Sequence, residues 1–451
     1  MEKINNKNCN TSFLVMTELH GWQWGVGLEF ILFELEQGRN CEVLDLSFVG
    51  ERFGAASLKN LLGGYKLRRA SIKHLKSKKI KVIKNRKKFF ITRTQTKNFI
   101  IENSIIHNSL CSKLESIDLD FIKNSWRGKL ILRNEIISSD RINQILTKLD
   151  RELNMSAYQK IVTVNGRFTK SATVIKYCKD NKYTYGLLEG GGLSKSSFQL
   201  FNVSPHSMGE IQEKIDDLWR SALSPTKELV AEKFIRDMVQ SKSIPGVNFR
   251  SKMKPNLIPK IGAKKVCVFY ASSEFEWIGV ADPIPHEYFQ NQQDSFRALV
   301  KLLEGESWDI FLRRHPKSST SKVADGESSI WHEFKELENV NIIGPESPID
   351  SIALGLEADL IASFWSSINM EFMARGLKNV INLGPAAWNR LVPENYLPTT
   401  EKIQKFLNNE PNKAEVKKLY PWAYYQAEAG NSFKIIETYS KTGIWKIKKL
   451  N

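Results

Sequence analysis

The feature that most constrains the fold of this chain is the regular alternation of short apolar runs with helical patterns. In the second half, strand and helix candidates alternate over residues 308–312, 329–338, 340–343, 349–357, 360–364 and 368–375. Strands that alternate with helices predict a parallel sheet. Ligands of such sheets bind beyond the carboxyl ends of the strands, so polar residues at those ends are the first candidates for function.

The first half of the chain repeats this alternation. Strand candidates at 12–19, 41–48, 160–164 and 183–188 accompany helix candidates at 25–37, 140–153, 169–180, 207–222 and 226–240. The 451 residues are too many for one core of ordinary size. We therefore predict an α/β protein with two Rossmann-like domains that face each other across a cleft. The expected parts are an N-terminal domain at 1–245, a linker at 246–262, a C-terminal domain at 263–410, and C-terminal helices at 411–451 that can pack back on the N-terminal domain.

The net charge of +17 is concentrated in one basic insertion, residues 66–97, which contains fourteen Lys and Arg residues and no Asp or Glu. Its pattern is neither helical nor cleanly alternating. The segment is either a solvated basic hairpin or a patch for an anionic membrane surface or an acidic polymer. We do not expect nucleic acid as a partner, because no helix-turn-helix, RNP-like aromatic run or zinc-finger spacing accompanies the charge.

The cysteines and the apolar runs bear on location. The five cysteines are scattered and lack CxxC spacing, which predicts a reducing compartment without a zinc site or a disulfide framework. The N-terminus lacks a secretory h-region, and no run approaches the length that spans a bilayer. We expect a cytoplasmic protein, soluble or peripheral on the inner membrane face.

The loop at 20–25 is not GxGxxG, so no dinucleotide cofactor is expected, and Trp22 and Trp24 either stack on a sugar or belong to the core.

Two motifs stand at predicted strand ends in the second half. The first, Arg313 to Pro316, combines cationic groups with an imidazole, and such a cluster binds phosphate. The second, Ser366-Ser367, opens a helical pattern and offers hydroxyls and backbone N–H groups to an anion. Each motif alone has a structural explanation, whereas together they favour a nucleotide-phosphate site. The predicted donor-nucleotide residues are Arg313, His315, Pro316, Ser366, Ser367 and Glu371, the last placed to accept a ribose hydroxyl or else to face solvent.

A family resemblance rests on these segments. The run Phe311 to Lys317, the run 341–344 and the run 358–367 with Glu371 resemble the C-terminal domain of bacterial GT-B glycosyltransferases. More narrowly, they are similar to the group that uses CMP-sugars: Kdo transferases of capsule and O-antigen synthesis, and sialyl- and polysialyltransferases. The resemblance covers about a third of the chain. It implies that His315-Pro316 is the HP motif and that Ser366-Ser367 is the Ser/Thr motif, which together hold the CMP moiety.

The resemblance also suggests roles in the N-terminal half. In related sialyl- and polysialyltransferases an acidic residue followed by Gly serves as the base, and Glu189-Gly190 is the nearest match, although the second acidic residue of that motif is absent. Glu189 can deprotonate an acceptor hydroxyl, attack the anomeric carbon itself, or be a polar loop residue. We take Glu189 as the candidate catalytic residue. Asn165, Arg167 and Gly190 are candidates for the donor sugar or the acceptor, and a structural salt bridge is the alternative for Arg167.

On the donor side, His315 with Arg313 would neutralise charge on the departing CMP phosphate, so His315 is the second catalytic candidate. No DxD pair ends a strand, so we expect no metal and no cofactor besides a CMP-linked donor. The expected function is transfer of a Kdo-like or sialic-acid-like sugar to a surface glycan or a lipid-linked acceptor. The alternatives are a CDP-glycerol phosphotransferase, a UDP-sugar GT-B transferase and a non-enzymatic anion-binding protein.

Overall fold

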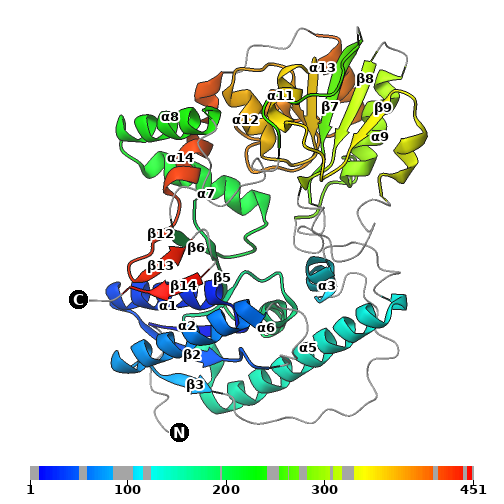
Figure 1. Ribbon diagram of the computed structural model, residues 1–451. Helices are drawn as coiled ribbons and strands as arrows, with labels where there is room; N and C mark the ends of the chain where they lie inside the picture. Colours follow the sequence, from blue (N-terminus) through cyan, green and yellow to red (C-terminus); the bar gives the residue numbers. More distant parts are fainter. Residues whose placement is uncertain are drawn as a thin grey trace.

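The computed structural model describes residues 10–49, 58–84, 105–114, 123–192, 196–240, 253–262, 264–273, 282–304, 308–316, 330–409, 415–439 and 444–448. These residues form two α/β domains, each built around its own sheet, and a C-terminal segment that runs from the upper domain back to the lower one in Figure 1. The predicted α/β class with two Rossmann-like domains is therefore confirmed.

The N-terminal domain has a seven-stranded sheet in the order β12-β6-β5-β4-β1-β2-β3. Its strands are β1 (Thr11–Met16), β2 (Asn40–Asp45), β3 (Val82–Lys84), β4 (Lys160–Val164), β5 (Tyr185–Gly190), β6 (Ser197–Phe201) and β12 (Asn431–Ser432). Strands β1 to β5 pair in parallel, whereas β6 and β12 are antiparallel to their neighbours. All six residues of β1 are buried, because helices cover both faces of this central strand.

Side chains along β1 alternate between two cores. Leu14 and Met16 belong to the core under α1 (Gly21–Glu36) and α2 (Leu58–Ser77). Phe13 and Val15 belong to the core under α5 (Trp126–Leu153) and α6 (Thr169–Asp180), on the opposite face. The short helix α3 (His107–Leu114) contacts α5, and the 3-10 helix η2 (Met155–Ala157) connects α5 to β4.

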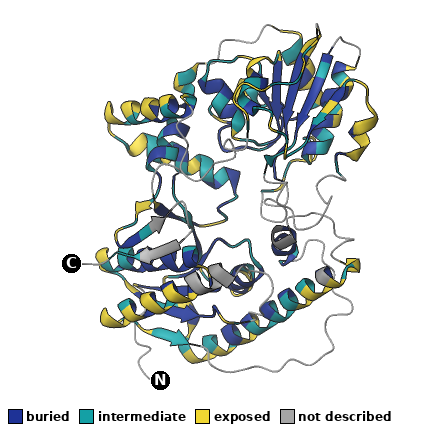
Figure 2. Ribbon diagram, in the orientation of Figure 1, coloured by how far each residue is buried: buried dark blue, intermediate teal, exposed yellow. Residues whose placement is uncertain are grey.

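The C-terminal domain has a five-stranded parallel sheet in the order β11-β10-β7-β8-β9. Its strands are β7 (Lys265–Tyr270), β8 (Trp308–Arg313), β9 (Val340–Ile343), β10 (Leu360–Ser363) and β11 (Val380–Asn382). Its helices are α9 (Gln292–Leu303), α11 (Ser351–Leu356), α12 (Ile368–Ala374) and α13 (Thr400–Leu407), with 3-10 helices η6 (His332–Glu336) and η7 (Pro393–Asn395). The strand interiors of both sheets are dark blue in Figure 2, as expected for sheets covered on both faces.

Two helices that precede the linker belong to the C-terminal domain. Side chains of α7 (Met208–Ser221) and α8 (Thr226–Val239) share one hydrophobic core with Val266 and Val268 of β7. The structural boundary therefore precedes α7, and the predicted boundary at residue 245 lies too late in the chain. The predicted cap of α7 is present, since Ser207 Oγ accepts a hydrogen bond from the Glu210 backbone N–H at 3.1 Å.

The C-terminal segment is not purely helical, in contrast to the prediction for 411–451. After the 3-10 helix η8 (Val416–Leu419), α14 (Tyr420–Glu428) packs against α7 and α8. The chain then joins the N-terminal sheet as β12, which pairs with β6. Strands β13 (Ile436–Tyr439) and β14 (Ile444–Ile447) pair with each other, and β14 lies against α1 and α2 (Figure 1).

Three local predictions need correction. The basic segment is not a hairpin in its described part, because residues 66–77 form the second half of α2; residues 85–97 lie outside the described residues. The loop predicted at 20–25 is the first turn of α1, with His20 as its N-cap, and Trp24 is buried in the core. The helix predicted at 329–338 is only the 3-10 helix η6, with residue 329 outside the described part. In the predicted linker, residues 253–262 form no helix or strand, and residues 246–252 are not described.

Two observations concern the environment of the chain. The four cysteines within the described residues, Cys41, Cys111, Cys178 and Cys267, are buried and form no disulfide. Burial raises the pKa of Cys111 and of Cys178 to about 12, so these two thiols are unreactive at neutral pH. None of the helices in the described part of the chain combines the length and the apolar character that a membrane-spanning segment needs.

Candidate functional site

The carboxyl edge of the C-terminal sheet carries both predicted nucleotide motifs. Strand β7 lies between β8 and β10, with Tyr270 level with Arg313 on one side and with Ser363 on the other. His315 therefore stands two residues beyond the aligned end of β8, and Ser366-Ser367 stand three and four residues beyond that of β10. Neighbouring strands lie about 4.8 Å apart, so the two motifs project from strand ends that are roughly 10 Å apart.

A third motif, which sequence reasoning missed, stands between them. Ser273 follows β7, and its Oγ lies 3.1 Å from Nδ1 of His315, so the hydroxyl orients the imidazole. The turn itself is fixed by Gln292, a residue of α9 that is 1% exposed. Gln292 Oε1 accepts from the Ser272 N–H at 2.9 Å, and its Nε2 donates to the Ser272 carbonyl at 3.2 Å. The available signal was a pair of serines directly after an apolar strand.

The two serines of the Ser/Thr motif have different environments. Ser366 Oγ accepts weakly from the Ile368 N–H at 3.4 Å, and the Ser366 N–H donates to Ser363 Oγ at 3.2 Å, so Ser366 organises the turn that leads into α12. Ser367 is exposed to solvent. Its hydroxyl, unlike that of Ser366, is therefore accessible to a ligand.

Arg313 does not have the predicted role. It is the last residue of β8 and is only 2% exposed. Its guanidinium donates to Ser351 Oγ at 3.2 Å and to the carbonyl oxygens of Gly344 and Ser347. Burial lowers the pKa of Arg313. These contacts commit the Arg313 guanidinium to holding the 344–351 loop, and we correct its assignment to the donor phosphate.

Glu371 lies on α12 and is partly committed as well. Its carboxylate is 4.0 Å from the Arg375 guanidinium, which also donates to the Val239 carbonyl of α8 at 3.0 Å. Burial, together with the carboxylates of Asp350 and Glu371, raises the pKa of Tyr270 far above its usual value, while Arg313 acts in the opposite direction. Glu371 is therefore near the end of β7, and its contact with a ribose hydroxyl remains a prediction. Pro316 is half-buried at the end of the described segment.

The carboxyl edge of the N-terminal sheet brings together Asn165, Arg167 and Glu189. Asn165 and Gly166 follow β4 with φ angles of 66° and 84°, a left-handed pair that favours the Asn-Gly dipeptide. Glu189, predicted directly after a strand at 183–188, is the fifth residue of β5, the strand next to β4. Asn165 Nδ2 donates to Glu189 Oε2, and the Gly190 N–H donates to Oε1 at 3.0 Å. Each carboxylate oxygen therefore accepts one hydrogen bond from the protein.

Burial raises the pKa of Glu189, and the Gly190 N–H, the Asn165 amide and the charge of Arg167 partly offset that rise. A carboxylate with a raised proton affinity suits a group that accepts a proton during a reaction. Arg167 itself lies against the ring of Phe168, with Cζ 5.2 Å from the ring centre. The charge of Arg167 is one of the influences that favour the ionised form of Glu189, so Arg167 lies near the candidate base.

The glycines after Glu189 have separate functions. At Gly190 a Cβ would meet no atom within 4 Å, so the space beside Glu189 is open. At Gly191 a Cβ would lie 1.8 Å from Ser197 Oγ, and at Gly192 it would lie 2.4 Å from the Gln426 carbonyl of α14. Gly191 and Gly192 are therefore required because the end of β5 packs tightly against β6 and α14, whereas Gly190 is free to face a ligand.

A second carboxylate at this edge was also missed. Glu18 lies two residues beyond β1, the strand on the other side of β4, and its Oε2 is 3.2 Å from Nζ of Lys170 on α6. The two side chains are 17% and 5% exposed. The strand predicted at 12–19 included Glu18, whereas the structure ends β1 at Met16 and leaves Glu18 beyond the strand. This ion pair gives the edge a second acidic group besides Glu189.

A groove of about 480 Å³ lies beside Arg167 and joins the two domains. One side is formed by Gly166, Arg167 and the α6 residues Lys176 and Lys179, and the other side includes Asp282 and Pro283 of the C-terminal domain. Asp282 also accepts hydrogen bonds from Ser207 Oγ and the Gly209 N–H, both at 3.1 Å, at the start of α7. The groove has polar and apolar lining residues, and Gly166 and Arg167 connect it to the Asn165–Glu189 pair.

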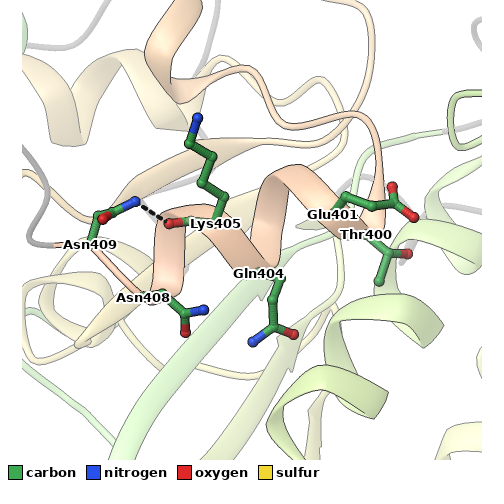
Figure 3. Close-up of a pocket in the computed structure, with 6 residues that line it drawn as sticks. All are labelled: Thr400, Glu401, Gln404, Lys405, Asn408 and Asn409. Carbon is green, nitrogen blue, oxygen red and sulfur yellow. Dashed lines mark hydrogen bonds between the residues drawn. The ribbon is translucent and has the colours of Figure 1, made fainter.

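A further hollow of about 490 Å³ lies on α13 (Figure 3). Its six lining residues all belong to positions 400–409, and Asn409 Nδ2 donates to the Lys405 carbonyl at 2.7 Å. Because one helix and its following turn supply the whole lining, the hollow has a single wall, and we assign it no function. Among the described residues, no group of three or more His, Cys, Asp and Glu side chains is arranged to hold a metal ion.

Comparisons with known proteins give structural likenesses only. No protein-family model matches the chain, and no curated protein matches it either. KpsC of Thermosulfurimonas dismutans, a beta Kdo 2,4 transferase, is 17% identical over 61% of this chain and 85% of its own, with a TM-score of 0.40. The UDP-GlcNAc 2-epimerase of Methanocaldococcus jannaschii is 9% identical over 96% of this chain and 97% of its own, with a TM-score of 0.29.

A glycosyltransferase from Rickettsia africae is 12% identical over 93% of each chain, with a TM-score of 0.25. Likenesses of this size do not decide the activity of the chain. The architecture is instead established by its own two sheets, and the chemistry has to be argued from the residues at their edges.

Proposed function

We propose that this protein is a GT-B glycosyltransferase that moves a Kdo-like or sialic-acid-like sugar from a CMP-activated donor to a surface polysaccharide or lipid-linked glycan. The observation that carries the proposal is the complementary chemistry of two sheet edges. One edge carries an oriented imidazole and the exposed Ser367, and the other carries a carboxylate with a raised pKa. A transfer from a phosphate leaving group to an acceptor hydroxyl needs both.

On the donor side, His315, Pro316 and Ser367 are the residues assigned to the CMP phosphate. The Ser273 hydroxyl fixes the imidazole of His315 at 3.1 Å, and this preorganisation favours charge that develops on the departing phosphate oxygen. Ser366 contributes by shaping the turn, and Glu371 is assigned to the ribose. Arg313 acts indirectly, because it holds the neighbouring loop.

On the acceptor side, Glu189 takes the proton from the acceptor hydroxyl as that oxygen bonds to the anomeric carbon. The bond between the anomeric carbon and the donor phosphate breaks, and CMP leaves with the electron pair. In a double displacement Glu189 would instead bond to the anomeric carbon first. Arg167 is assigned to the carboxylate of an acidic donor sugar, and the groove beside it is assigned to the acceptor.

The basic face of α2 supports a location at an anionic membrane surface. The exposed residues on this face recur at helical spacing, namely Lys66, Arg69, Lys73 and Lys76. Phe48 and Tyr65, which are 49% and 41% exposed, form an aromatic pair at one end. Figure 2 shows the outward side of α2 as exposed. Such a face suits anionic headgroups, where lipid-linked acceptors are found.

The test is a thermal-shift screen with CMP, CDP, UDP and GMP, followed by product analysis with CMP-Kdo and CMP-sialic acid. A ligand that binds only the native state raises the melting temperature. We expect CMP to give the largest rise, and His315→Ala and Ser367→Ala to reduce it without unfolding the protein. A response to CDP or UDP alone would replace the donor assignment, and no response to any nucleotide would refute the transferase proposal.

A further inference from the structure

The environment of Asn165 differs from that of a sugar-binding residue. Its Oδ1 accepts a hydrogen bond from the Arg167 backbone N–H at 3.0 Å, which fixes the orientation of the amide. The amide nitrogen is therefore directed at Glu189 Oε2. Asn165 is 8% exposed. Both ends of this side chain are thus engaged inside the protein, one of them by the candidate base.

The backbone around Asn165 holds this geometry in place. The Asn165 N–H donates to the Leu188 carbonyl of β5 at 2.8 Å, and the Gly166 N–H donates to the Val164 carbonyl of β4 at 2.8 Å. The turn is thereby attached to the strand that carries Glu189. Its left-handed φ of 66° suits Asn, Asp or Gly and few other residues.

We propose that Asn165 is a positioning residue for Glu189: its amide on Oε2, together with the Gly190 N–H on Oε1, fixes the orientation in which the carboxylate meets the reacting hydroxyl. The inference rests on the proposed function for its catalytic meaning, but the Asn165–Glu189 contact can be tested without any reaction. It replaces the sequence-based assignment of Asn165 to the donor sugar or the acceptor.

The charges around Glu189 define what loss of the amide would do. Arg167 faces it from the β4–α6 turn, and the Glu18–Lys170 pair lies at the end of β1, one strand beyond β4. On β6, the described residue opposite Glu189 is the uncharged Gln199, which accepts from the Tyr425 hydroxyl. Removal of the Asn165 donor therefore removes one of few groups that favour the ionised carboxylate.

Two substitutions of Asn165 distinguish a role of its amide in positioning Glu189 from a role of the residue in the shape of the turn. Asn165→Gly keeps the left-handed backbone and deletes the amide, whereas Asn165→Asp keeps shape and backbone but places a second carboxylate against Glu189. Two adjacent carboxylates share a proton, so the Asp variant is expected to have the larger effect. If Asn165 served only as a turn residue, the isosteric Asp variant would be the milder of the two.

The primary measurement is the titration of the Glu189 carboxyl by ¹³C NMR of the full-length protein labelled at glutamate Cδ, with the signal assigned by Glu189→Gln. We expect its pKa to rise by about one unit in Asn165→Gly, the equivalent of one hydrogen bond, and further in Asn165→Asp. Asn154→Gly is the matched control, because Asn154 is also left-handed, with φ of 51°, at the end of α5. An unchanged titration in both Asn165 variants would overturn the inference.

The second measurement is CMP release from CMP-Kdo or CMP-sialic acid as a function of pH. The pH below which kcat/KM falls is expected to increase in the order wild type, Asn165→Gly, Asn165→Asp. Below that pH, kcat/KM is expected to be about tenfold lower for each unit by which the pKa of the base rises. A loss of activity with an unmoved limb would contradict the positioning role. If the wild type transfers neither sugar while the NMR shifts appear, the contact is confirmed and the proposed function fails.

Discussion

Glu29 provides the most direct test of how the C-terminal segment is held. This residue lies in the middle of α1 and is 2% exposed. Its Oε1 accepts from the backbone N–H groups of Ile435 and Ile436 at 2.7 and 2.6 Å, and its Oε2 accepts from Lys434 at 2.9 Å. One buried carboxylate thus accepts hydrogen bonds from three consecutive backbone N–H groups. The third of them belongs to the first residue of β13.

The expected loss can be worked out from these contacts. Glu29→Ala leaves the three amides without an acceptor, and each orphaned buried donor costs about 1–3 kcal/mol. Local relaxation will let water reach some of them, so we expect a total of about 3–5 kcal/mol. Glu29→Gln keeps one oxygen but turns an NH₂ group toward a backbone N–H, which predicts a loss of about 1–2 kcal/mol.

The assay is urea unfolding combined with hydrogen exchange of the amides at 434–436. We expect exchange at these amides to accelerate in the order wild type, Gln, Ala. Glu36→Ala is the control, because Glu36 pairs with the side chain of Lys434 in the same region but is 44% exposed, and an exposed pair contributes less than about 1 kcal/mol. Equal effects of Glu29→Ala and Glu36→Ala would refute the reasoning.

Three further predictions follow from the edges of the sheets and from α2. Arg313→Ala is expected to lower the free energy of unfolding by about 2–4 kcal/mol, because Ser351 and two loop carbonyls lose a buried donor; a variant of wild-type stability with weakened CMP binding would return Arg313 to the nucleotide. Gly192→Ala is expected to lower the melting temperature markedly, whereas Gly190→Ala, whose Cβ meets open space, is expected to leave it unchanged; equal melting temperatures would contradict the packing argument. Replacement of the four exposed basic residues of α2 by Gln should weaken sedimentation with vesicles that contain phosphatidylglycerol, with the difference disappearing at high salt; unchanged sedimentation at low salt would exclude this face. The residues to replace are Lys66, Arg69, Lys73 and Lys76.

Local pattern determined much of this protein. The alternation of apolar runs with helical patterns predicted the central parallel strands of both sheets, because burial of a strand or a helix face imposes its own period on the sequence. It did not predict β6 and β12, the antiparallel strands at one side of the N-terminal sheet. It also located the polar groups at strand ends, among them His315, Ser367 and Glu189. The position of a polar residue relative to the end of a strand depends only on neighbouring residues, so it can be predicted from the sequence.

Orientation and neighbourhood were decided by the tertiary structure. Arg313 and His315 are two residues apart, yet Arg313 is buried and His315 is only half-buried, because Arg313 is still part of the covered strand β8 whereas His315 lies beyond its end. Ser273 reaches His315 only because β7 lies between β8 and β10. Strand order results from crossover connections between distant segments, and no periodicity in the sequence reports it.

The same reason applies to the N-terminal sheet and to the division into domains. Asn165 and Glu189 are 24 residues apart and meet because β4 and β5 are neighbours in that sheet. Helices α7 and α8 precede the linker, but their apolar faces are buried against β7 and α14 in the other domain. The sequence determines which faces must be buried, whereas only the packed structure decides which distant segment covers them.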